Sequence, residues 1–264
     1  MDPALSEPLV EQMHLPCALQ WGVVTDVGCV RQQNEDAYAM EPEAGLFLVT
    51  DGMGGHRGGE LASAMIAQDL PPALETAWMH TRGRGRKAVV RLLRRIVGDH
   101  SRQLRLEGHS ETGCKGMGAT LALVWLLDKR VYLANVGDSR IYRWRQGRLR
   151  QLSRDHSVVA ELIEDGQLHP DEAEAHEENG VITRYIGMDE QAKPCVRSFG
   201  LKAGDRMLLC TDGLTDMVSD EDIAIVLSQD LEPQGCCDRL VQTALAAGGY
   251  DNVTVLVVQR PGRL

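Results

Sequence analysis

Apolar positions along the chain follow two periods, one typical of strands and one typical of helices. Several short apolar runs end at glycine or aspartate, as β-strands do where they meet a turn. Two longer segments instead place apolar residues three and four positions apart, which is typical of the buried face of a helix. The predicted strands lie within 18–28, 46–52, 119–137, 139–152, 195–213 and 252–260. The predicted long helices cover 59–79 and 87–106.

The order of these elements favours an α+β fold with antiparallel sheets. Most strands follow one another through short turns, such as 128–129 and 203–204, and blocks of strands flank the pair of long helices. Two shorter helices are predicted at 219–227 and 236–248, the first with Ser219 as its N-cap. A doubly wound parallel sheet is less consistent with this order, because parallel strands need long crossover connections.

Several segments interrupt the pattern. Residues 1–18 form a proline-containing N-terminal leader, and 81–87 form a basic linker broken by glycines between the two long helices. We interpret 31–40 as a loop and 155–180 as a short, acidic, partly helical insertion on the surface. No boundary of a second domain is visible, so 19–260 is expected to form one domain.

Composition narrows the class of protein. A net charge of −10 over 264 residues argues against bulk affinity for nucleic acid or an anionic membrane. No apolar run approaches the roughly 20 residues that span a bilayer. The leader has no basic start and no long apolar segment, so we see no secretion signal and expect a cytoplasmic protein. The seven cysteines include no CxxC pair and are expected to be free thiols.

A basic stretch offers a nucleic-acid interpretation that we rank low. The sequence RGRGRK is followed by Arg91, Arg94 and Arg95, but no aromatic residues are interleaved with these charges. A solvated loop and helix face is the better interpretation.

Acidic residues recur where the predicted strands meet turns. The strands LFLVTDG and MLLCTDG both end in Thr-Asp-Gly, at Asp51 and Asp212, and further acids occur at Glu35, Asp36 and Asp251. A single Asp-Gly pair is usually only a turn. Because strand ends gather at one end of an antiparallel sheet stack, several such acids are expected to converge. Converging carboxylates repel one another unless a cation neutralises them, and oxygen ligands without His or Cys favour Mg²⁺ or Mn²⁺.

Two neighbours of these acids carry further chemistry. Gly52 has no side chain to prevent its carbonyl from approaching such an ion. Arg31 precedes Asp36 by five residues and is read either as a surface ion-pair partner or as a phosphate-binding guanidinium.

Six motifs in order resemble a known family. RQQNEDA, VTDGMGG, GMGAT, NVGDSR, CTDGLTD and YDNVTV are similar to the motifs of the metal-dependent protein serine/threonine phosphatases of type 2C, bacterial branch. The resemblance covers residues 19–259. It implies a four-layer α-β-β-α sandwich, in which two antiparallel sheets are flanked by helix pairs, with a binuclear metal site at one end.

The resemblance also implies roles for individual residues. Asp51 resembles the carboxylate that bridges both metals, and the Gly52 carbonyl resembles a ligand of one of them. Asp212 and Asp251 resemble ligands of one metal, whereas Glu35 and Asp36 match the acidic pair that serves the site mostly through water. Arg31 resembles the arginine that holds phosphate, and Asn252 is expected only to orient its loop.

The implied chemistry is hydrolysis by a metal-activated water. Two ions about 3.5–4 Å apart lower the pKa of a water and brace the phosphoryl oxygens. Met53 stands where eukaryotic members carry a histidine proposed as general acid. Leaving-group protonation is therefore expected from water or from another group. We interpret His56 as a surface residue rather than as that acid.

The chain departs from the family at a third metal site. Many bacterial members have carboxylates at two positions where this chain has Lys115 and Cys195. We expect two Mn²⁺ or Mg²⁺ ions and no third ion. The alternative is that the alignment is off by a residue or that Lys115 simply points to solvent.

The expected function is the dephosphorylation of phosphoserine and phosphothreonine on proteins, opposing a bacterial Ser/Thr kinase. The expected partners are phosphorylated proteins and that kinase, with neither nucleic acid nor membrane, and the protein is expected to be a monomer. The alternative from another class is a catalytically silent regulatory domain on the same fold. Retention of Arg31, Asp36, Asp51, Asp212 and Asp251 argues against it.

Overall fold

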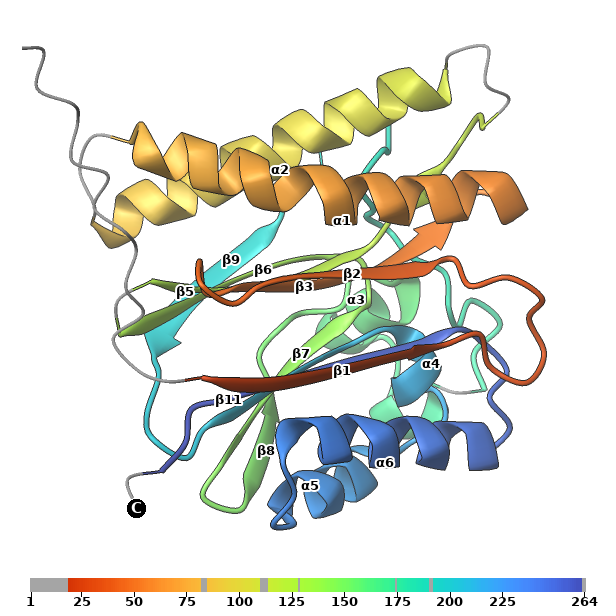
Figure 1. Ribbon diagram of the computed structural model, residues 1–264. Coiled ribbons are helices and arrows are strands. Elements are labelled where there is room, and N and C mark those ends of the chain that lie inside the picture. Colours follow the sequence, from red (N-terminus) through yellow and green to blue (C-terminus); the bar gives the residue numbers. More distant parts are fainter. Residues whose placement is uncertain are drawn as a thin grey trace, which may run out of the picture.

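The computed structural model describes residues 19–81, 85–109, 114–127, 129–173, 175–189 and 192–262. Two antiparallel sheets are stacked face to face, and helices cover both outer faces of the stack (Figure 1). The four-layer α-β-β-α sandwich expected from the sequence is thereby confirmed. The leader 1–18 and part of the basic linker lie outside the described residues.

The first sheet has the strand order β1-β11-β10-β7-β8, and every neighbouring pair is antiparallel. The C-terminal strand therefore lies beside the first strand of the domain. The strands are β1 (Gln20–Asp26), β7 (Arg140–Arg145), β8 (Arg148–Gln151), β10 (Arg206–Cys210) and β11 (Val253–Gln259).

The second sheet has the order β2-β3-β5-β6-β9, again antiparallel, and the short strand β4 pairs antiparallel with the end of β3. Its strands are β2 (Asp36–Glu41), β3 (Leu46–Met53), β4 (Gly118–Ala119), β5 (Leu121–Leu127), β6 (Arg130–Val136) and β9 (Cys195–Gly200).

Helices cover the two outer faces. The pair α1 (His56–Met79) and α2 (Arg86–Gly108) packs on the second sheet. The first sheet is covered by α5 (Asp220–Ser228) and α6 (Pro233–Ala246), together with the single turn α4 (Asp212–Thr215). Ser219 caps α5 as expected, because its hydroxyl accepts a hydrogen bond from the Asp222 amide at 3.2 Å.

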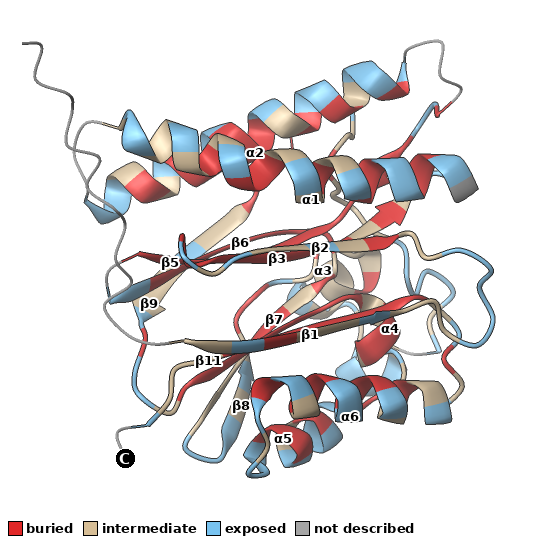
Figure 2. Ribbon diagram, viewed as in Figure 1, coloured by how far each residue is buried: buried red, intermediate tan, exposed pale blue. Residues whose placement is uncertain are grey.

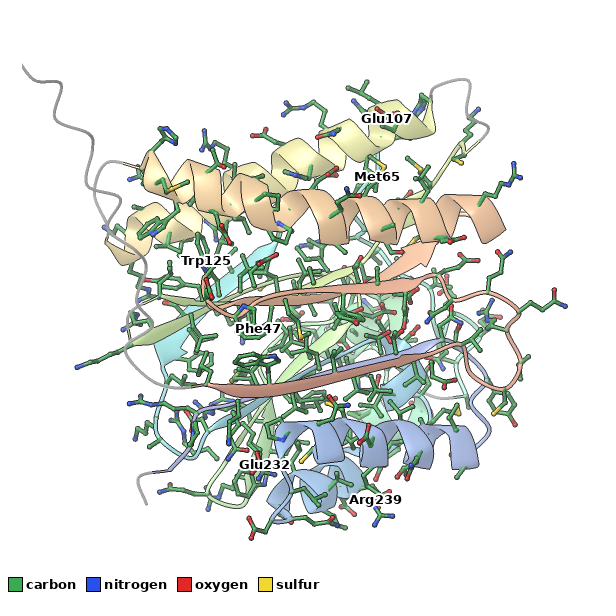
Figure 3. The ribbon with its side chains drawn as sticks, viewed as in Figure 1. Phe47, Met65, Glu107, Trp125, Glu232 and Arg239 are labelled. Carbon is green, nitrogen blue, oxygen red and sulfur yellow. The ribbon has the colours of Figure 1, made fainter. Side chains whose placement is uncertain are left out.

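Three apolar layers hold the sandwich together. Strand β3 shows why its sequence reads as a continuous apolar run: Leu46 and Leu48 pack towards the helices, whereas Phe47 and Val49 pack between the sheets. Both faces of the strand are therefore buried (Figure 2). Figure 3 shows Phe47 between the two sheets and Trp125 beneath the upper helices.

Two details of the sequence interpretation were wrong. Residues 36–40, predicted as loop, belong to the edge strand β2, whose weak alternation is compensated by pairing along β3. Residues 212–215 form a helical turn that was not predicted. The two strands predicted within 195–213 both form, but β9 pairs with β6 in one sheet and β10 pairs with β7 and β11 in the other.

The acidic insertion contains little regular structure. Within 155–180 the structure places one short helix, α3 (Val158–Glu164), and a 3-10 turn at Pro170–Glu172. Most of the described residues beyond α3 in this insertion are exposed.

Candidate metal centre

The second sheet contributes two carboxylates through one strand pair. Asp36 is the first residue of β2 and lies directly opposite Asp51 on β3. The sequence placed Asp51 at the end of its strand, but β3 continues to Met53 because β4 pairs with Gly52 and Met53. Like charges at directly opposed positions of a sheet destabilise it. This arrangement therefore has a cost that a bound cation would offset.

The first sheet contributes two more carboxylates from neighbouring strand ends. Asp212 starts the α4 turn after β10, and Asp251 lies in the loop just before β11. These strand ends lie on the same side of the molecule as the end of β3, at the right in Figure 1. The expected convergence of acids from both sheets is present.

The electrostatics show how close these groups are. The pKa of Asp51 is raised well above its ordinary value, first because its carboxyl is desolvated and then because of the negative charges of Asp212 and Asp36. The pKa of Asp212 is also raised well above its ordinary value, again first by burial and then by neighbouring acids. Desolvated carboxylates that repel one another in this way are characteristic of functional sites.

Asp36 is the best-defined member of the group. One carboxyl oxygen, Oδ2, accepts hydrogen bonds from the hydroxyls of Thr211 at 2.9 Å and Thr254 at 2.7 Å. The other oxygen, Oδ1, is buried and has no partner among the described residues. Burial raises the pKa of Asp36 to about 7, although the two hydroxyls oppose this shift. An orphaned buried oxygen of this kind suits a ligand that the protein itself does not supply.

Gly52 allows Glu35 to approach the same region. The Gly52 amide donates a hydrogen bond to the Glu35 carbonyl at 3.1 Å. A side chain at Gly59, in the first turn of α1, would collide with a carboxyl oxygen of Glu35 and lie 2.7 Å from the Gly52 carbonyl. The Glu35 carboxyl oxygen and the Gly52 carbonyl oxygen therefore both approach the helix backbone at Gly59, where no side chain is present. The sequence did not reveal this role of Gly59.

Arg31 pairs with Asp251, one acid of the group. Its guanidinium donates a hydrogen bond to an Asp251 oxygen at 2.6 Å, and both side chains remain partly exposed. Both interpretations of Arg31 are compatible with this geometry, since the ion pair forms and the guanidinium also stands beside the acids. The Asn252 amide group donates to the carbonyls of Val27 and Gln33 and accepts from the Glu35 amide, so it connects its loop to the segment that precedes β2.

Asp138 is the functional candidate that sequence reasoning missed. It follows β6, and burial raises its pKa to about 6. Its charge also raises the pKa of Asp212 and of Asp51, so it belongs to the same group. The motif NVGDSR contributed to the family resemblance, but its Gly-Asp pair resembles an ordinary turn and received no role.

Other residues singled out in the sequence lie apart from the acids or cannot be placed. Lys115 is exposed in the turn before β4, and Cys195 starts β9. No described contact joins either residue to the acid group. The His56 side chain lies outside the described part of the structure.

The donor set fits hard divalent cations. Among the described residues, no three acidic, histidine or cysteine side chains already close on one point as a finished metal site. However, buried oxygens of Asp36 and Asp212 have no hydrogen-bond partner in the described structure. Carboxylate and carbonyl oxygens without imidazole or thiolate are the donors that Mg²⁺ and Mn²⁺ prefer.

Comparison with known proteins decides the family. The family model described as protein phosphatase 2C matches residues 30–246, which is most of the chain. The chain belongs to the protein phosphatase 2C family. The expectation of a metal-dependent protein phosphatase is thereby confirmed, and the silent regulatory domain is not favoured.

Similar proteins within the phosphatase 2C family are bacterial. The protein phosphatase PhpP of Streptococcus pneumoniae is 35% identical over 243 residues, which cover 91% of this chain and 97% of PhpP. The serine/threonine phosphatase of S. agalactiae has 35% identity and a TM-score of 0.84, covering 92% of this chain and 99% of that one. The catalytic domain of PstP, solved in complex with two manganese ions, has 35% identity and a TM-score of 0.74 over 91% and 97% of the two chains.

Membrane association was not expected for this phosphatase 2C member. Among the helices within the described residues, none combines the length and the apolar character needed to cross a bilayer.

Proposed function

We propose that this protein hydrolyses phosphoserine and phosphothreonine on other proteins, using a water activated by two divalent cations. The observation that carries the proposal is the convergence of acids from two separate sheets, with buried oxygens of Asp36 and Asp212 that no described residue satisfies. Its family membership supports the same activity, since relatives at about one third identity include proteins named serine/threonine phosphatases.

The family resemblance suggests roles for the acids. Asp51, whose pKa is raised by acids of both sheets, would be shared by the two ions. The Gly52 carbonyl, Asp212 and Asp251 would complete the ligands, and Glu35 and Asp36 would act through water. Two bound Mn²⁺ or Mg²⁺ ions supply Lewis acidity and lower the pKa of a water.

Substrate binding is assigned to Arg31. Its guanidinium is half exposed beside Asp251, so it can hold phosphate through a bidentate contact. Pairing with Asp251 fixes its direction before the substrate arrives. Because Met53 provides no proton donor next to Gly52, the leaving group takes its proton from water or from another group.

We further propose that no third ion is held at Lys115 and Cys195. An ammonium repels a divalent ion by several kcal/mol at about 4 Å near a protein surface. The exposed position of Lys115 also agrees with the simpler interpretation that its amine points to solvent.

The proposal extends to the location, oligomeric state and biological role of the protein. We propose a cytoplasmic monomer that opposes a Ser/Thr kinase by removing phosphate from the proteins that the kinase modifies. The net charge of −10 supports protein substrates rather than nucleic acid.

A simple assay tests the proposed function. Hydrolysis of p-nitrophenyl phosphate is measured with the protein stripped by EDTA and then resupplied with Mn²⁺. We expect no turnover in EDTA and full recovery with Mn²⁺. Equal, negligible turnover in both conditions, for a protein that melts cooperatively, would favour the silent regulatory domain instead.

A further inference from the structure

A basic pocket lies outside the acid group. It has a volume of about 600 Å³, and its walls come from α2, from the segment after β8 and from the residues that lead into β9. Helix α2 crosses over β9 in this region (Figure 1). The cationic side chains that line it are Arg94, Arg95, Arg154, Arg184 and Lys193, and His156 joins them.

Within the described residues, the positive charge of this pocket is mostly unmatched. Arg154 pairs with Glu164 of α3. The other four cations form no ion pair with any residue that the structure describes. No acidic residue among those that the structure describes lines the pocket. The cations repel one another at this close spacing, and an anionic ligand would offset that repulsion.

The pocket is connected to the acid group through one short path. His156 is buried, and its Nδ1 accepts a hydrogen bond from the Gly137 amide at 3.1 Å. Gly137 directly precedes Asp138. The His156 carbonyl also accepts from the Thr183 amide at 2.7 Å, which holds the far end of the acidic insertion. A ligand in the pocket thus contacts the base of that insertion and lies one hydrogen bond from the Asp138 loop.

We propose that this pocket binds a phosphate group other than the one being hydrolysed. Arginine guanidinium groups bind phosphate through paired hydrogen bonds, and Arg94 and Arg95 are consecutive exposed residues of α2 that both line the pocket. A volume of about 600 Å³ lies in the usual range for ligand pockets and exceeds the needs of a bare phosphate. The pocket therefore accommodates a phosphate together with part of its carrier.

Nucleic acid fits this pocket less well than a compact phosphate. Non-specific binding of single strands relies on aromatic side chains on which bases stack, and none of the described residues that line the pocket is aromatic. The two sources of compact phosphate are a second phosphoserine or phosphothreonine on a protein substrate and a free phosphate compound.

Binding is tested directly by NMR on the magnesium-loaded, ¹⁵N-labelled protein titrated with inorganic phosphate. We expect saturable shifts of the Arg184 and Lys193 amides in the wild type. The double variant Arg94→Ala/Arg95→Ala should weaken this response about tenfold, because two guanidinium contacts are lost. Alanine is a good helix former at these exposed positions, so the fold should persist.

A matched control removes the same charge from the same helix. Arg91→Ala/Arg102→Ala changes exposed arginines of α2 that do not line the pocket and should leave the response unaltered. Equal weakening in both double variants, or no saturable shift at Arg184 and Lys193, would overturn the proposal. Shifts with a single-stranded oligonucleotide but none with phosphate would also overturn it. These readouts need no turnover, so they do not depend on the proposed catalysis.

A second arm distinguishes the two sources. kcat/KM is compared for a peptide with two phosphoserines and for the same peptide with one. If the pocket takes a second substrate phosphate, the doubly phosphorylated peptide is preferred by the wild type and the control variant, and the preference is lost in Arg94→Ala/Arg95→Ala. Phosphate binding without any such preference assigns the pocket to a free phosphate compound.

Discussion

Asp36 and Asp51 illustrate how single residues are placed for function at a cost in stability. They face each other across a strand pair, and both have raised pKa values, chiefly because their carboxyls are desolvated. No cation of the described protein neutralises Asp51, since Arg31 pairs with Asp251 instead. Acids held in this way destabilise the fold in the absence of a cation and are suited to binding one.

Removing one of these acids should separate activity from stability. In Asp51→Ala and Asp212→Ala we expect phosphatase activity to fall by about three orders of magnitude at saturating Mn²⁺, because ligands of the proposed ions are lost. The metal-free variants should melt at or above the wild-type temperature, since repulsion is relieved. Turnover and thermal melting check the two statements.

The control for this prediction is Asp230→Ala, which removes an exposed acid after α5. It should change neither turnover nor melting. Near-wild-type turnover in Asp51→Ala or Asp212→Ala would rule out the binuclear mechanism.

The sequence revealed most of the acid group but not all of it. Asp51 and Asp212 stand out because a Thr-Asp-Gly stretch follows a buried strand twice. Asp138 follows a strand as well, but in a Gly-Asp-Ser turn of ordinary composition, so only its burial identifies it. Gly59 could not be found, because the close approach of Glu35 depends on how α1 packs against β3.

At the scale of elements, buried strands were easier to predict than edge elements. Strand β3 is buried on both faces and its apolar run is unmistakable. Strand β2 lies at the edge and has a mixed pattern, so its pairing along β3 decides its conformation. The separation of β9 and β10 into different sheets was also hidden, because a turn at 203–204 suits a hairpin and a crossing between sheets equally well.

The acidic insertion should influence which substrates are used. Its helix is anchored at the base, where Glu164 pairs with Arg154 and Glu161 accepts a hydrogen bond from Thr183. Its remaining exposed acids should disfavour acidic phosphopeptides and favour basic ones, more strongly at low salt. kcat/KM on peptides of opposite charge measures this preference. Equal values at low ionic strength would contradict it.

At the scale of the whole molecule, the centre draws acids from both sheets. β3 supplies Asp51, whereas the strand ends next to β10 and β11 supply Asp212 and Asp251. Ions held between these residues would connect the two halves of the sandwich. Metal binding should therefore stabilise the whole fold, by an amount that grows with ion concentration.

This stabilisation should depend on pH. The pKa of Asp36 is raised to about 7 and that of Asp138 to about 6, chiefly by burial. The folded metal-free protein then retains protons that the unfolded chain has released, so its stability falls as pH rises from about 4 to about 7. Bound Mn²⁺ favours the ionised carboxylates and should cancel this loss.

Melting of the metal-free and Mn²⁺-loaded protein between pH 5 and 8 provides the measurement. His156 opposes the carboxyls below about pH 6.5, because burial lowers its pKa to about 4. Asp36→Asn removes one of the carboxyls whose pKa is raised and should reduce, without abolishing, the pH dependence of the metal-free protein. An unchanged slope in Asp36→Asn would show that Asp36 is not the group responsible.

Anomalous diffraction from a crystal grown in millimolar Mn²⁺ tests the central claim most directly. The account predicts two strong peaks among the acids, both within ligand distance of the Asp51 carboxylate, and no peak within reach of Lys115 or Cys195. The absence of any peak beside Asp51, in a crystal whose protein is active with Mn²⁺, would contradict the proposed centre. A strong peak beside Lys115 or Cys195 would contradict the proposed loss of the third ion.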